Sequence, residues 1–169
     1  MTNNQIINQL EKSKTVFKNL LIGKNQQEYL WRPQPNKWCL LEIICHLLDE
    51  EREDFKARVK HTLELPNEVM KGINPEGWVV ERNYIAQNYN EKVLEFLQER
   101  SKSVAWLSNL NNVQWENIYK HPKLGDLSAK LFLVNWLAHD YLHMRQIIRY
   151  KYEYLKDHID IDVQYAGSW

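Results

Sequence analysis

The segment NWLAHDYLHMRQ, residues 135–146, determines how the rest of the chain is interpreted. His139 and His143 are four residues apart, so on a helix they lie one above the other and their rings can converge on one point. Apolar residues flank the pair on nearly every side, which indicates a helix buried in a bundle. The pair therefore predicts two ligands of a metal site. The alternative is two core or interface histidines with ordinary hydrogen bonds, since one pair supplies only two of the three or four ligands that a site needs.

Composition limits the class of protein. The chain has 169 residues, 44% of them hydrophobic, and only five glycines and five prolines, which is enough for one well-buried domain over residues 1–169. Lys plus Arg and Asp plus Glu both number 22, so no net charge attracts a polyanion, and we expect no nucleic-acid partner.

The two cysteines and the start of the chain indicate a soluble, cytoplasmic protein. Cys39 and Cys45 are six residues apart in one expected helix and would not face each other, so we expect no disulfide and a reducing compartment. The first residues lack a basic and apolar leader, and no apolar run approaches the roughly 18 residues that span a bilayer. We therefore expect no membrane partner.

Hydrophobic periodicity predicts four long helices and thus an all-α four-helix bundle. We expect them over about 4–21, from Trp38 or Cys39 to about 59, over 83–110, and from an N-cap at Asp126 to about 152. Residues 31–36 form a proline-stiffened linker and 111–125 an extended loop. Residues 61–82, which are polar and contain Pro66, Gly72, Pro75 and Gly77, form a long crossover or lid. A long connection allows the second and third helices to run parallel, and we predict that they do.

The second helix carries the remaining candidates of the site. His46 falls roughly 60° beyond Ile43, on the edge of the apolar arc, and facing helices of a bundle can pool ligands. We expect it to meet His139 and His143, which leaves a coordination position open, as in catalytic sites. Glu50 lies four residues after His46 and is a candidate catalytic group, with a surface carboxylate as the alternative.

Two motifs resemble the DinB/YfiT-like superfamily. PNKWCLLEIICHL, residues 35–47, resembles the start of the second helix in that family, and HDYLHMRQI, residues 139–147, resembles its last-helix motif. The final YAGSW, residues 165–169, looks like the tail of many members. The resemblance implies a four-helix bundle with one metal ion held by His46, His139 and His143. The family often has Ser or Thr where this chain has Cys39, opposite Glu42, so we expect a weaker cap and a fraying helix start.

The resemblance leaves three functions open. Relatives include transferases and isomerases that use small thiols such as bacillithiol or mycothiol, and metal-dependent hydrolases. A bound divalent ion, zinc or nickel by expectation, lowers the pKa of a thiol or a water and so serves both reactions. We favour a small-thiol-dependent S-transferase acting on a small electrophile, because no H-E-x-x-H arrangement supplies a base for hydrolysis. Non-catalytic metal binding in a stress or interaction protein is the third function.

Other expectations concern the surroundings of the site. Trp78 in the crossover is a candidate cover over a small-molecule substrate, with packing of the long loop onto the bundle as the alternative. We expect His61, His121 and His158 to be dispensable, with His121 the first of them to test. The sequence leaves a homodimer open.

Overall fold

The computed structural model describes residues 1–167, so Ser168 and Trp169 of the tail motif lie outside the described residues. The elements in chain order are α1 (Asn3–Leu21), α2 (Gln26–Leu30), α3 (Leu40–Asp49), the π-helix η1 (Glu50–Phe55), α4 (Lys56–Glu64), α5 (Pro75–Glu81), the 3₁₀ turn η2 (Tyr84–Ala86), α6 (Tyr89–Ser108), β1 (Ile118–His121), β2 (Gly125–Ser128), α7 (Ala129–His158) and the 3₁₀ turn η3 (Gln164–Ala166). α3, η1 and α4 follow one another without a break and form the predicted second helix.

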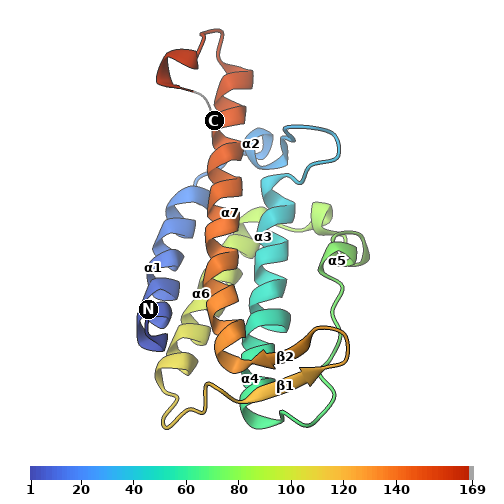
Figure 1. Ribbon diagram of the computed structural model, residues 1–169. Helices are drawn as coiled ribbons and strands as arrows, with labels where there is room; N and C mark the ends of the chain where they lie inside the picture. The colour runs from blue at the N-terminus through green and yellow to red at the C-terminus, as the bar shows by residue number, and fades with distance from the viewer. Residues whose placement is uncertain (168–169) are drawn as a thin grey trace.

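The bundle has the predicted topology. In Figure 1, α1 and α7 run upward, whereas the α3–α4 helix and α6 run downward. The second and third long helices are therefore parallel, and the connection after α4, which contains α5 and η2, returns the chain to the upper end. The four-helix bundle with a long crossover between helices two and three is confirmed. None of the helices in residues 1–167 has the length and apolarity needed to cross a membrane.

Several predicted boundaries are wrong. α6 begins at Tyr89 because Asn83 adopts a left-handed conformation with φ 46° and Asn88 is the N-cap, its side chain accepting from the backbone N–H of Glu91. α7 begins after Ser128, whose hydroxyl accepts from the N–H of Leu131. It ends at His158, six residues beyond the prediction.

The segment predicted as an extended loop forms half of an antiparallel hairpin. β1 and β2 pair with Ile118 opposite Ser128 and His121 opposite Gly125. Asp126, predicted as the N-cap of the last helix, lies in β2 opposite Lys120. Gly125 supports the tight turn, since its φ of 78° is costly for other residues.

The start of α3 is held by charge instead of a hydroxyl cap. The Glu42 carboxylate accepts from the backbone N–H of Cys39 at 2.9 Å and from two nitrogens of Arg32 at 2.6 and 2.8 Å. Leu40, the first residue of α3, is fully buried, and the fraying expected at this helix start stays a prediction. Cys39 and Cys45 are free and buried, and burial raises their thiol pKa values to about 11 and about 12.

A buried ion cluster joins all four long helices. Arg100 of α6 donates to Glu51 of η1 at 2.8 to 3.0 Å and to Asp140 of α7 at 2.5 and 2.8 Å. Trp136 Nε1 donates to Glu51 at 2.8 Å, and Arg100 also reaches the carbonyl oxygen of Leu10 in α1 at 3.4 Å. Arg100, Glu51 and Asp140 expose 1% or less of their surface, so one buried guanidinium is the counterion of two buried carboxylates, and burial raises the pKa of Asp140.

Candidate metal centre

Three histidines from two helices converge on one point. His46 comes from α3, and His139 and His143 come from consecutive turns of α7. The Nε2 atoms of His139 and His143 lie 3.0 Å apart, and the His46 ring centre is 5.5 and 5.0 Å from those of His139 and His143. One ring nitrogen of each histidine lies within 4.8 Å of the other two. Within residues 1–167, no cysteine, aspartate or glutamate joins this cluster.

The hydrogen bonds around the rings fit a metal ion. His143 Nδ1 and Gln146 Oε1 are 2.8 Å apart, so Nδ1–H donates to the amide oxygen and Nε2 carries the lone pair that faces His139. Nδ1 of His46 is buried and has no hydrogen-bond partner. Two Nε2 atoms 3.0 Å apart are unfavourable unless a proton or a cation lies between them, and a buried ring nitrogen without a partner is unfavourable as well. The donor set therefore fits a divalent ion.

Burial keeps the three rings in the neutral form that binds metal. It lowers the pKa of His46 to about 3, with a further contribution from His143. It lowers the pKa of His139 to about 2, where the neighbouring His143 and His46 add to the effect. The pKa of His143 is lowered by burial as well, although the hydrogen bond to Gln146 opposes this. All three rings are thus neutral near neutral pH, and each has one nitrogen with a free lone pair, as ligation requires.

Aromatic rings wall the cluster. The Trp38 ring centre is 5.0 Å from that of His46, and the Phe55 ring centre is 4.9 Å from that of His139. Phe55 in turn stacks on Trp136 with a centroid distance of 6.1 Å. These apolar walls limit water at the rings and strengthen electrostatic interactions there.

Glu50 is not a surface carboxylate, so that alternative is wrong. It is only 4% exposed, because the π-helical turn after α3 directs both Glu50 and Glu51 inward. Glu50 Oε1 has no hydrogen-bond partner, and burial, assisted by Asp54, raises the pKa of Glu50 to about 9. The group is therefore protonated near neutral pH and does not belong to the three-histidine cluster.

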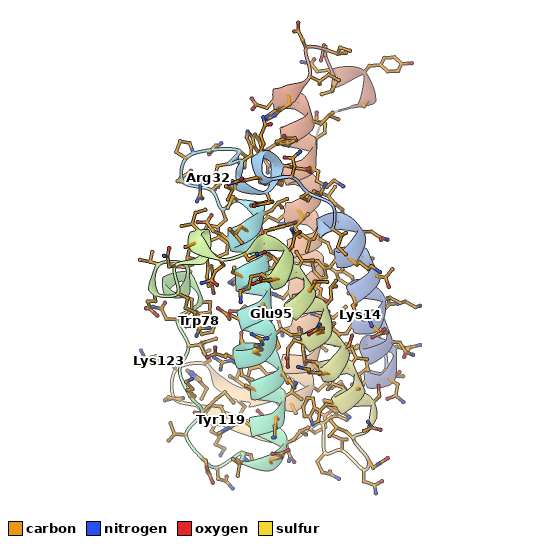
Figure 2. All side chains as sticks on the ribbon, turned by 180° about the vertical axis from the view of Figure 1, so that it is seen from behind. Lys14, Arg32, Trp78, Glu95, Tyr119 and Lys123 are labelled. Atoms are coloured by element: carbon orange, nitrogen blue, oxygen red, sulfur yellow. The ribbon has the colours of Figure 1, made fainter. Side chains whose placement is uncertain are left out.

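The position of Trp78 corresponds to the packing alternative. Trp78 lies on α5 beside α3 (Figure 2), it is buried in the core cluster around α3, and the Arg82 guanidinium lies 4.1 Å from its ring centre. Its ring therefore supports the crossover, and its role as a substrate cover stays a prediction.

The other histidines lie outside the cluster. His61 Nε2 is 2.9 Å from the carbonyl oxygen of Glu68, and His158 stacks on Tyr154 near the end of α7. His121 Nδ1 accepts from backbone N–H groups in the turn of the hairpin. Each of the three thus has a local structural contact.

Sequence analysis missed the residues that support the site. Gln146 follows His143 by three residues, so it lies on the same helix face, and this spacing could have identified it. Arg100 lies four residues after Phe96 and seven after Val93, on the buried face of α6. A charged residue in phase with an apolar stripe predicts a buried partner of opposite charge, although it does not say which one.

Comparison with known proteins agrees with this fold. Among curated protein sequences, none matches this chain. A solved structure, YfiT from Bacillus subtilis, superimposes with a TM-score of 0.76 at 15% sequence identity, over 88% of this chain and 85% of that one. YfiT is described as a probable metal-dependent hydrolase with an unusual four-helix bundle topology. The family profile of the DinB superfamily matches residues 9–147. The chain therefore belongs to the DinB superfamily.

Proposed function

We propose that this protein is a metal-dependent enzyme that holds one divalent ion with His46, His139 and His143. The observation that carries the proposal is the convergence of three neutral imidazoles, with no carboxylate among them in the described residues. Zinc and nickel both suit imidazole ligands. An ion held by neutral ligands keeps its double positive charge and lowers the pKa of a thiol or a water that binds it.

We favour a small thiol as the nucleophile, transferred to a small electrophile. A free thiol has a pKa of about 8.5, so it needs little help to ionise near neutral pH, whereas water needs far more. Glu50 is buried and protonated near neutral pH, which makes it a poor base for activating water. The residues of the chain contribute orientation and water exclusion: Gln146 fixes the His143 ring, and Trp38 and Phe55 cover the histidines.

Hydrolysis is the second candidate. The similarity in fold to YfiT, described as a probable metal-dependent hydrolase, favours it. Glu50 lies one helical turn beyond His46 and would be the group to supply a proton in that reaction. Metal binding without catalysis is the third candidate, and an inert protein in both assays below would support it.

A pair of assays on the metal-loaded protein separates these functions. Protein purified from its own host is first subjected to elemental analysis, and then incubated with 1-chloro-2,4-dinitrobenzene with and without a small thiol. Thiol transfer predicts that the electrophile is consumed above the uncatalysed rate only with thiol present, and that this activity is lost in His143→Ala. Hydrolysis predicts release of nitrophenol from p-nitrophenyl acetate without thiol. Turnover of the ester alone would contradict the thiol proposal.

A further inference from the structure

A pocket of about 400 Å³ shares two lining residues with the surroundings of the histidine cluster. Its walls come from the proline linker before α3, from α3 itself and from α7. Trp38 and Gln146 both line it, and both contact histidines of the cluster: the Trp38 ring is 5.0 Å from that of His46, and Gln146 is hydrogen-bonded to His143. These two side chains therefore connect the lining of the pocket to the cluster.

The pocket has an apolar wall. Trp38 lines it together with Pro33 of the linker and Ile43 of α3. A volume of this size holds a small organic molecule, and an aromatic wall favours a flat or aliphatic body.

The pocket also has a net positive charge. Lys37 and Arg149 line it together with one carboxylate, Glu153. Arg149 Nε donates to Glu153 at 2.7 Å, so this carboxylate neutralises the arginine. Lys37 is exposed, and its ammonium has no ion pair or hydrogen bond within the part of the chain that the structure describes. One unpaired cation thus faces the pocket on the side of the linker.

We infer that this pocket binds the body of a small anionic molecule whose reacting group reaches the histidine cluster past Trp38 and Gln146. Its carboxylate or phosphate would pair with Lys37, and its apolar part would lie against Trp38. The inference rests on the proposed function, because the pocket is a substrate site only if the histidines are the reaction centre. It places the approach to the histidines at the linker and α7, not at the crossover that carries Trp78.

Calorimetric titration of the zinc-loaded protein with three related probes tests the inference. Glutathione carries a thiol and carboxylates, glutathione diethyl ester keeps the thiol but loses the carboxylate charges, and S-methylglutathione keeps the carboxylates but loses the thiol. At low ionic strength we expect glutathione to bind about three- to tenfold more tightly than its diethyl ester, as one partly exposed ion pair allows.

Lys37→Gln should abolish this preference and weaken S-methylglutathione to the same extent. The matched control is Lys123→Gln, which makes the same charge change on the exposed turn of the hairpin and should behave as wild type. Figure 2 shows Lys123 toward one end of the bundle and Arg32, which belongs to the linker, toward the other. The exposed side chain of Lys37 has no hydrogen bond or ion pair to lose within residues 1–167, so the variant should fold normally.

The failures of the two proposals are distinguishable. If S-methylglutathione binding depends on Lys37 but a thiol does not make the metal-loaded protein consume 1-chloro-2,4-dinitrobenzene above the uncatalysed rate, the pocket stands and the thiol function falls. If the ester binds as tightly as glutathione, if Lys37→Gln and Lys123→Gln have equal effects, or if no probe binds, the pocket inference is wrong.

Discussion

Replacing Arg100 with Met should destabilise the protein strongly, because it leaves two carboxylates buried without a counterion. Arg100 makes five hydrogen bonds of 3.0 Å or less, three to Glu51 and two to Asp140. All three side chains are buried and shielded from water. Removing one partner of a buried ion pair costs about 3 to 5 kcal/mol. A domain of this size has about 5 to 15 kcal/mol of total stability, so the variant should lie close to the limit of folding.

Urea denaturation followed by circular dichroism measures the loss, and the melting temperature should fall by roughly 6 to 20 °C. Burial already raises the pKa of Asp140 and Arg100 opposes this, so loss of the guanidinium should raise the pKa of Asp140 further above its value in the unfolded chain. The folded variant then holds protons that the unfolded chain releases, so its deficit should be larger at pH 8 than at pH 5. Loss of packing alone would give equal deficits at the two pH values.

Arg52→Met is the matched control. Arg52 lies on η1, next to Glu51, and pairs with Glu95 and Glu99 at 3.3 and 3.7 Å, but it is partly exposed. Such a pair contributes about 0 to 1 kcal/mol. Adding Glu51→Gln and Asp140→Asn to Arg100→Met should recover part of the stability, because no unpaired charge then stays buried. An Arg100→Met variant within 1 kcal/mol of wild type at both pH values would refute the reasoning.

Three further predictions concern the histidine cluster and Glu50. His143→Ala should remove most of the bound metal while circular dichroism stays helical, and stoichiometric metal by elemental analysis would contradict the site; His121→Ala should keep its metal. Gln146→Leu should weaken zinc binding by about 10-fold or more in a competition titration with a chelator, because the His143 ring loses the hydrogen bond that orients it. An unchanged affinity would show that this hydrogen bond does not orient the ligand. Because the pKa of Glu50 is raised to about 9, its contribution to the stability of the metal-free protein is present below pH 4.5 and is lost as the pH rises toward 9. In urea denaturation, Glu50→Gln should therefore be more stable than wild type at pH 8, with a smaller difference at pH 5. A difference that does not grow with pH would mean that Glu50 is ionised in the folded protein.

The sequence by itself was sufficient for the features that depend on neighbours along the chain. The apolar period of 3.6 residues identified the long helices, and the spacing of His139 and His143 placed both rings on one face, because the geometry of a helix is local. The length of the segment after the second helix predicted that helices two and three are parallel, since a long connection lets the chain return to the same end of the bundle. The helical wheel placed His46 only at the edge of the apolar arc, the bundle architecture made it a candidate third ligand, and the family resemblance implied the same three histidines.

Only the tertiary structure decided the features that depend on partners distant in the chain. Asp126 resembles an N-cap, yet pairing with Lys120 keeps it in a strand, because hydrogen bonds between strands outweigh a local capping preference. Glu50 and Glu51 belong to a charge run that is normally solvated, but the π-helical turn directs them inward, where Arg100 is available to Glu51. The free energy of burying a charge is set by what lies opposite to it, and that partner comes from another helix, so periodicity along one helix does not contain it.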